Sequence, residues 1–149
     1  MISGLLANKI LIAALTAWTI AQLVKVPLEY IRAKHWNWSL LLRAGGMPSS
    51  HSALVAGIAH GTGLYAGFDS PVFALAFAFA MVVIYDATGI RRQAGKHAHI
   101  INQIMDDLTS GHPLKEEQLR EVLGHTPIEA LVGTLLGIAM AQLIWLFWK

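Results

Sequence analysis

Long stretches without Asp, Glu, Lys or Arg constrain the fold of this chain more than any other feature of its sequence. Four of them, each bounded by charged residues, cover residues 10–24, 44–68, 70–85 and 130–148. About 20 consecutive apolar residues cross the hydrocarbon core of a bilayer, so the pattern predicts four transmembrane helices. The first and third stretches are shorter than this and require snorkelling of the flanking charges, local thinning of the bilayer or burial inside a bundle.

The composition agrees with a membrane protein and excludes several other classes. Of the 149 residues, 55% are hydrophobic and 13% are charged, whereas soluble domains carry about 25% charged residues. The formal net charge is only +2, and the basic residues cluster between apolar stretches, which favours phosphates at a bilayer surface over a nucleic-acid partner. The absence of cysteine excludes disulfides, thiolate catalysis and cysteine metal sites.

We therefore expect one integral membrane domain over residues 1–149, an all-α polytopic bundle of about four spans plus interfacial helices. Residues 67–71 leave room only for a tight hairpin, so the loops at 25–43 and 86–127 lie on the same side of the membrane. Most basic residues occupy these loops, and the positive-inside rule places both in the cytoplasm, at a bacterial-type plasma membrane. If some of these basic residues bind phosphate, their positions reflect that function and do not indicate the orientation of the chain in the membrane.

Two further helices are expected outside the spans. Residues 90–108 have an apolar face and a polar face and should lie on the bundle or at the interface. Residues 114–123 predict a short interfacial helix before the last span. That span begins with the pattern of a capping box, with Thr126 at the N-cap, Pro127 at the first helical position and Glu129 two residues later.

The segment 45–52, Gly-Gly-Met-Pro-Ser-Ser-His-Ser, has the composition of an anion-binding helix start. Two glycines let the backbone turn, and Pro48 is expected to pre-set the first helical turn. Ser49 and Ser50 offer hydroxyls at the positive end of a helix dipole, where phosphate binds well. His51 could then exchange a proton with a phosphate ester. The alternative is that these serines only cap a membrane helix.

A second polar cluster follows the third span. Asp86 needs a partner at this boundary; Arg91 or Arg92 could supply it, while the other arginine clamps a phosphate. Alternatively, both arginines only neutralise a boundary aspartate. His97 shares a face with apolar residues and is either a buried catalytic imidazole or a core histidine. His97 and His99 point in opposite directions on a helix, which disfavours a metal pair.

With these elements the chain resembles the divergent branch of the type 2 phosphatidic acid phosphatase superfamily. The superfamily as a whole also contains the vanadium haloperoxidases. The resemblance extends over most of the chain. The matching elements are Ala21-Gln22 with Lys25-Val26-Pro27, the block 45–53, Asp86-Ala87 with Gly89, Arg91, Arg92 and Gly95, Asn102, and the block 123–129.

The resemblance implies roles for particular residues, although the fit to the wider superfamily is uneven. Lys25 and Arg32 have the spacing of its first catalytic element, but alanine stands where that element has proline. The second element, Pro-Ser-Gly-His, corresponds to 48–51 with serine in place of glycine. His51 would protonate the leaving oxygen, while Ser49 and adjacent amides would hold phosphate.

The third element contains an arginine and a nucleophilic histidine, which Arg91 and His97 match in spacing. Ile90 replaces its serine and Ile101 its orienting aspartate, so no obvious group fixes the tautomer of His97. Asp86 competes as the nucleophile, as the group orienting His51 or as a metal ligand.

Three residues, namely Gly46, His125 and Glu129, could complete the pocket. The alternative is that Thr126 and Glu129 only cap the last helix and that His125 is merely their neighbour.

The expected function is hydrolysis of a lipid phosphate or a prenyl (di)phosphate at the membrane interface, without metal or other cofactor. Lys25, Arg91 and Arg92 would neutralise charge, and Ser49 and Ser50 would bind oxygens. The expected partners are membrane lipids and the phosphorylated substrate, and a homodimer would complete the small bundle. The alternatives are a non-catalytic phospholipid-binding or transport-type protein and a metal-dependent lipid phosphotransferase.

Overall fold

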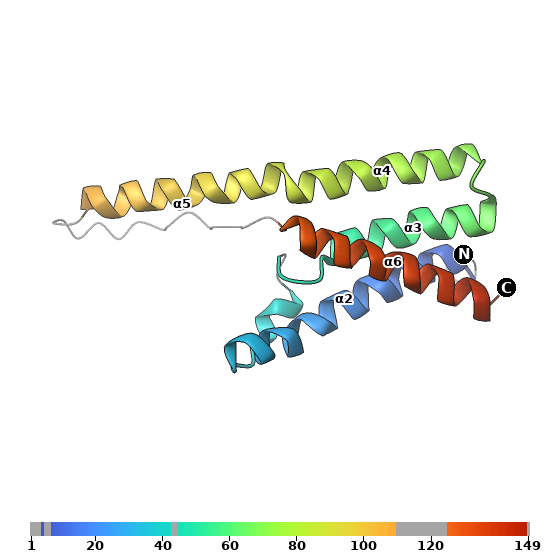
Figure 1. The fold of residues 1–149 in the computed structure, drawn as a ribbon, viewed down its shortest axis with the longest axis horizontal. Coiled ribbons are helices and arrows are strands. Elements are labelled where there is room, and N and C mark those ends of the chain that lie inside the picture. The colour runs from blue at the N-terminus through green and yellow to red at the C-terminus, as the bar shows by residue number, and fades with distance from the viewer. Residues whose placement is uncertain (1–3, 5–6, 43–44, 110–124, 149) are drawn as a thin grey trace.

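The computed structural model describes residues 4, 7–42, 45–109 and 125–148, without the side chains of residues 90–92, 96, 107 and 109. These residues form helices and no strand. In chain order the elements are α2 (Lys9–Ala33), the 3-10 helix η1 (Trp38–Leu41), α3 (Ser50–Ala66), α4 (Pro71–Thr88), α5 (Ile90–Thr109) and α6 (Pro127–Phe147) (Figure 1). The predicted all-α bundle is confirmed.

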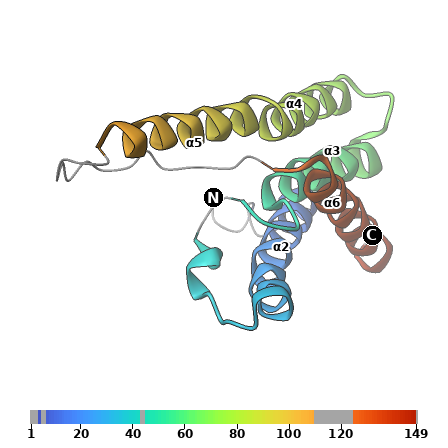
Figure 2. The same cartoon turned by 60° about the vertical axis from the view of Figure 1, so that its left-hand side comes forward.

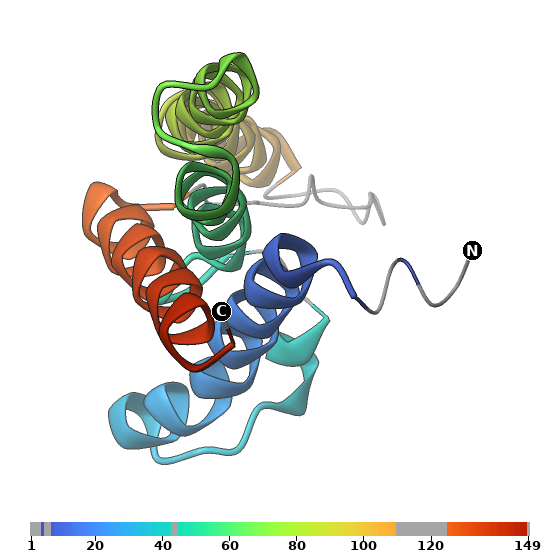
Figure 3. The ribbon, with the colours of Figure 1, turned by 90° about the vertical axis from the view of Figure 1, so that its right-hand side faces the viewer.

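Helix α3 lies at the centre of the bundle. It packs against α2, α4 and α6, and α2 and α6 also contact each other. Viewed along the long axis, α4 lies on one side of α3 while α2 and α6 lie on the other (Figure 3). A residue on α3 can therefore contact side chains from three neighbouring helices.

Small residues allow these helices to approach closely. Ala13, Ala14 and Ala17 of α2 are fully buried. On α6, a Cβ atom added at Gly133 would lie 2.2 Å from the Ser49 carbonyl oxygen, and one at Gly137 would lie 2.3 Å from the Ala53 carbonyl oxygen. Within a membrane, such packing replaces the hydrophobic effect as the main force that holds helices together.

Three stretches of helix are long and apolar enough to cross a membrane, namely α2, the continuous stretch Pro71–Asp106 and α6. Helix α3 has 17 residues, which is the lower end of the spanning range. It carries no Asp, Glu, Lys or Arg, and it lies among the other three helices. The α3–α4 connection is the expected hairpin, in which Gly67 adopts a φ of 95° and the Ser70 side chain caps α4.

Two predicted boundaries are wrong. The first span does not end at residue 24, because α2 continues through Lys25 and Pro27 to Ala33. Lys25 is only 2% exposed, and polar side chains around it allow the helix to keep this charge inside the bundle. The second span begins at Ser50 with Ser49 as N-cap, so Pro48 precedes the helix instead of forming its first turn.

Helix α5 forms over nearly the predicted residues. Of the two places expected for it, a position on the bundle is wrong, and a position at the membrane interface stays a prediction. The helix continues the line of α4 and extends past the ends of the other helices (Figures 1 and 2), and α4 is the one described helix that it contacts. Hydrogen bonds from the Gly89 N–H to the Tyr85 oxygen (2.8 Å) and from the Gln93 N–H to the Gly89 oxygen (3.1 Å) carry the helical pattern across the junction. The expected helix at 114–123 falls outside the described residues.

Candidate functional site

Buried polar side chains gather at one end of the bundle, where α3 and α6 begin and α4 ends. They come from α2, from α3 with its N-cap and from the residue before the α6 N-cap. The group consists of Gln22, Lys25, Ser49, Ser50, Ser52 and His125, each at most 8% exposed. Because buried polar groups are costly unless they are satisfied, their concentration at one end indicates a site.

Two backbone hydrogen bonds tie the three helix ends together. The Ser49 N–H donates to the Glu129 carbonyl oxygen (3.0 Å), which joins the starts of α3 and α6. The His125 N–H donates to the Ala87 carbonyl oxygen (3.0 Å), which joins the start of α6 to the end of α4. Asp86, partly buried, therefore sits next to a residue in direct contact with His125.

Lys25 brings a positive charge from α2 to the start of α3. Its Nζ donates to the Gln22 side-chain oxygen and, at 3.5 Å, to the Ser50 hydroxyl. Gln22 is itself held by donation from its Nε2 to the Leu41 carbonyl oxygen (2.9 Å). Glu129 of α6 acts on Lys25 as an attractive charge. A lysine and the positive end of a helix dipole thus meet in one place, which favours an anion.

The serines of α3 have distinct positions. The Ser49 hydroxyl accepts hydrogen bonds from the Ser52 N–H (3.3 Å) and from the Ser52 hydroxyl (3.0 Å), so Ser49 caps the helix. Helix geometry leaves the Ser50 N–H without an intrahelical acceptor. Before the helix, Gly46 has a φ of +77°, a conformation that glycine adopts without strain. The turn predicted from the two glycines is confirmed, whereas phosphate binding by the serines stays a prediction.

Two imidazoles face this region from α3 and from the start of α6. The His51 and His125 ring centroids are 6.4 Å apart, so one small group could contact both rings. His125 Nδ1 lies 3.1 Å from Glu129 Oε2, and that oxygen also accepts the Thr126 N–H at 3.1 Å. The predicted capping box is present, and its glutamate holds the imidazole as well. A histidine whose Nδ1–H donates to a carboxylate carries its lone pair on Nε2.

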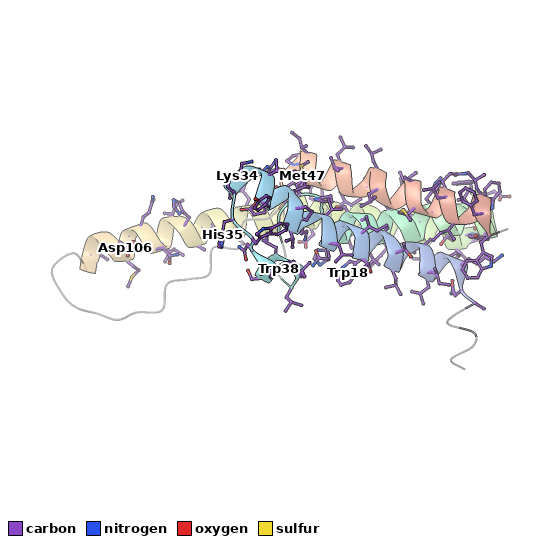
Figure 4. All side chains as sticks on the ribbon, turned by 90° about the horizontal axis from the view of Figure 1, so that it is seen from below. Trp18, Lys34, His35, Trp38, Met47 and Asp106 are labelled. Atoms are coloured by element: carbon purple, nitrogen blue, oxygen red, sulfur yellow. The ribbon has the colours of Figure 1, made fainter. Side chains whose placement is uncertain are left out.

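A small cleft of about 40 Å³ opens beside Lys25, with room for a few water molecules. Its lining includes Lys25 and Arg32 from the same face of α2, together with Gly46 and Met47. Figure 4 shows Met47 near the end of α2 that leads to Lys34 and His35, while α5 with Asp106 extends farther in the same direction. Gly46 and Lys25 thus line the same cleft, and a role of Gly46 in a functional pocket stays a prediction.

The structure does not bring His97 to this site. Both sequence interpretations of His97 required burial, but its side chain is exposed on α5, which packs against no described helix except α4. The straight α4–α5 junction is the physical reason, because it directs α5 away from α3. Arg91 and Arg92 lie in the first turn of α5, and their side chains fall outside the described part of the chain.

Sequence reasoning missed the role of Gln22, which connects Lys25 to the segment after α2. The spacing of three residues on a helix could have revealed this pair. It also treated His125 and Glu129 as two separate additions to a pocket. Their spacing of four residues is the signal that they form one hydrogen-bonded pair.

Comparison with known proteins gives consistent results. The model of the family described as "Divergent PAP2 family" matches residues 6–140. A protein of Bacillus subtilis (strain 168), named "Uncharacterized membrane protein YuiD", is 39% identical over 154 residues, which cover 96% of this chain and 98% of that protein. No solved structure matches the chain.

Proposed function

Because this chain belongs to the Divergent PAP2 family, we propose that it is an integral membrane phosphohydrolase acting on a lipid phosphate or a prenyl diphosphate. One observation carries the proposal, namely the convergence of a buried lysine, a helix start and two imidazoles at one end of the bundle. Phosphoryl transfer depends mainly on positioning and on charge stabilisation, and this group of residues is suited to both.

In the proposed mechanism the phosphate binds at the start of α3. Lys25 neutralises its charge, and Ser50 and the first turn of the helix donate hydrogen bonds to its oxygens. Ser49 contributes by fixing the helix start, because its hydroxyl and its amide already have partners within the protein. Arg91 and Arg92 remain proposed phosphate ligands on account of their position directly after α4.

We assign the nucleophile to His125 rather than to His97 or Asp86. The Glu129 carboxylate beside Nδ1 would fix the tautomer with the lone pair on Nε2 and would stabilise the cation formed during attack, as a carboxylate does in other His–carboxylate pairs. The pair therefore has the orienting carboxylate that His97 lacks, because Ile101 stands where the superfamily has an aspartate. His51, at 6.4 Å between ring centroids, is the acid.

The reaction proceeds in two steps. His125 Nε2 attacks the terminal phosphorus, the bond from that phosphorus to the leaving oxygen breaks, and His51 gives its proton to that oxygen, which is the lipid oxygen of a monophosphate and the bridging oxygen of a diphosphate. Water then attacks the phosphohistidine and passes a proton to His51, and inorganic phosphate leaves as His125 is regenerated. The lipid product is an alcohol from a monophosphate and a monophosphate from a diphosphate.

The test is phosphate release by the detergent-purified protein from a panel of lipid phosphates and prenyl diphosphates. We expect His51→Ala, His125→Gln and Glu129→Gln to lower the rate by about a hundredfold or more, with His97→Gln as the matched control that retains activity. Asp86→Asn tests whether Asp86 is the nucleophile. If it only supports the site, the rate of phosphate release should fall by about tenfold or less; loss of a nucleophile would cost far more. Loss of activity in His97→Gln but not in His125→Gln would contradict the assignment.

A non-catalytic phospholipid-binding or transport-type protein is the second candidate. It is favoured by the exposed position of His97 away from the bundle, since the matching histidine in the wider superfamily is the nucleophile. This alternative predicts that phospholipid co-purifies with the protein but that no substrate of the panel is hydrolysed, with or without divalent metal.

The metal-dependent phosphotransferase has no comparable support. Within the ranges that the structure describes, no three His, Asp or Glu side chains group as metal ligands. Its test is sensitivity to EDTA.

We also propose that the site faces the cytoplasm at a bacterial-type plasma membrane and that a homodimer forms. Accessibility of a cysteine introduced beside Met47 tests the orientation.

A further inference from the structure

A second cavity lies deeper in the bundle, between α3, α4 and α6, with a volume of about 200 Å³. Its lining includes Ala56 of α3, Phe73 and Ile84 of α4 and Thr134 of α6. This volume is below the roughly 300–1,000 Å³ of pockets that enclose whole drug-sized ligands, but it exceeds the 150 Å³ or so of a cavity that binds benzene. The cavity therefore fits a short length of one hydrocarbon chain and not two chains side by side.

The cavity begins just below the polar site on all three helices. At 1.5 Å per residue, Ile84 lies about 4.5 Å along α4 from Ala87, whose carbonyl holds His125. Thr134 lies about 7.5 Å along α6 from Glu129, and Ala56 the same distance along α3 from His51. At its far end the cavity reaches Phe73, about 20 Å along α4 from Asp86. A chain attached to a phosphate at the site would enter the cavity directly.

The surface of the cavity suits hydrocarbon. Its two polar lining side chains have partners within the protein, since His60 Nε2 lies 3.1 Å from Gln142 Oε1 and the Thr134 hydroxyl donates to the Ala130 oxygen (2.9 Å). Phe77 and Met81 of α4 line the cavity and are also 53% and 54% exposed, so the cavity opens sideways on the outer face of α4. In a bilayer this opening faces lipid and allows a chain to enter laterally.

We propose that this cavity, the chain groove, binds the single hydrocarbon chain of the phosphorylated lipid and selects single-chain substrates, such as prenyl phosphates, over two-chain phosphatidic acids. The inference deepens the proposed function and rests on it for the position of the phosphate. The chain groove sets which lipids place their phosphate between His51 and His125, because its volume of about 200 Å³ holds one chain and not two.

The test uses two adjacent exposed positions on α4. Met81 lines the chain groove and Val82, 67% exposed, does not, so Met81→Trp obstructs the groove while Val82→Trp is the matched control. The probes are farnesyl phosphate, a dioleoyl phosphatidic acid and inorganic phosphate, with binding to the purified protein measured separately from phosphate release. We expect Met81→Trp to weaken farnesyl phosphate binding by about tenfold and to leave inorganic phosphate unaffected. Val82→Trp should match wild type.

A second variant tests the same groove by enlarging it. Phe77→Ala should raise the affinity for phosphatidic acid relative to farnesyl phosphate by several-fold, because space for a second chain appears. Equal binding of farnesyl phosphate by Met81→Trp and Val82→Trp would overturn the proposal, as would equal affinity of wild type for the two lipids.

The binding measurement separates this proposal from the proposed hydrolysis. If wild type hydrolyses no lipid but Met81→Trp alone loses farnesyl phosphate binding, the chain groove stands and the phosphohydrolase does not. If wild type hydrolyses lipids while the two tryptophan variants behave alike, the phosphohydrolase stands and the chain groove does not. Binding of uncharged farnesol as tightly as farnesyl phosphate, which would make the groove a general bilayer-lipid site, would also overturn the proposal.

Discussion

Replacing Gly133 with alanine should destabilise the bundle at the contact that aligns the two halves of the site. The added Cβ would lie 2.2 Å from the Ser49 carbonyl oxygen, and 3.1 Å from both the Ser49 carbonyl carbon and the Ser52 Cβ. Backbone atoms cannot rotate away as a flexible side chain can, so α6 and α3 must separate by about 0.8 Å to relieve the contact.

The size of the effect follows from two opposing contributions. Overpacking of a well-packed contact costs about 1–3 kcal/mol, whereas alanine favours a helix over glycine by up to about 1 kcal/mol. We therefore expect Gly133→Ala to lower the free energy of unfolding by about 1–2 kcal/mol. The separation also moves His125 and Glu129 away from His51 and Lys25, so phosphate release should fall as well.

Gly61→Ala is the matched control. Its added Cβ would meet Ile10 at 3.4 Å, an ordinary van der Waals contact with a side chain, so the helix preference for alanine should dominate and stability should be unchanged or higher. The assay is unfolding in mixed micelles of increasing SDS content, followed by far-ultraviolet circular dichroism. If Gly133→Ala is as stable as Gly61→Ala, the close contact between α3 and α6 is not as described.

Three further predictions concern the site. Lys25→Met should weaken binding of a phosphorylated lipid by about tenfold or more, because it removes the positive charge at the start of α3; unchanged affinity in a binding titration would argue against a phosphate at this place. Thr126→Ala should cost about 1 kcal/mol in the same SDS unfolding assay through loss of the α6 N-cap and should lower activity by loosening Glu129, whereas activity equal to wild type would separate the capping box from the chemistry. Phosphate release should persist in EDTA and be inhibited by vanadate, and the reverse pattern would favour the metal-dependent phosphotransferase.

Local sequence signals predicted the N-cap of α6 and the turn before α3. The Thr126–Glu129 capping box forms as expected, because all of its atoms lie within one turn and depend little on the rest of the fold. The turn at the two glycines before α3 is confirmed for the same reason. These are short-range features, in which residue type alone fixes the hydrogen bonds.

Features that depend on neighbouring helices were predicted less well. Lys25 marked the end of a span in the sequence, since a charge usually ends an apolar stretch. In the fold, Gln22 and Ser50 hydrogen-bond to it and Glu129 attracts it, so α2 continues past it. The partners Ser50 and Glu129 come from other helices, so no local pattern around Lys25 indicates them.

The orientation of α5 was unpredictable for a similar reason. Its amphipathic pattern indicates a helix with an apolar face but does not identify what that face contacts. The hydrogen bonds that Gly89 makes with Tyr85 and Gln93 keep α5 in line with α4, and His97 therefore lies on an exposed surface. His125 lies close to the start of α3 because a hydrogen bond between Ser49 and Glu129 joins the starts of α3 and α6.

The most direct test of the central claim is to trap the covalent intermediate. Protein incubated with a prenyl phosphate labelled on phosphorus would be quenched in alkaline SDS, which preserves phosphohistidine, and the labelled peptide mapped in wild type, His125→Gln and His97→Gln. A lipid phosphohydrolase built as proposed carries the label on His125, loses it in His125→Gln and keeps it in His97→Gln. Release of phosphate with the label on another residue would contradict the proposed nucleophile, and lipid binding without any label or release would show a binding protein in place of an enzyme.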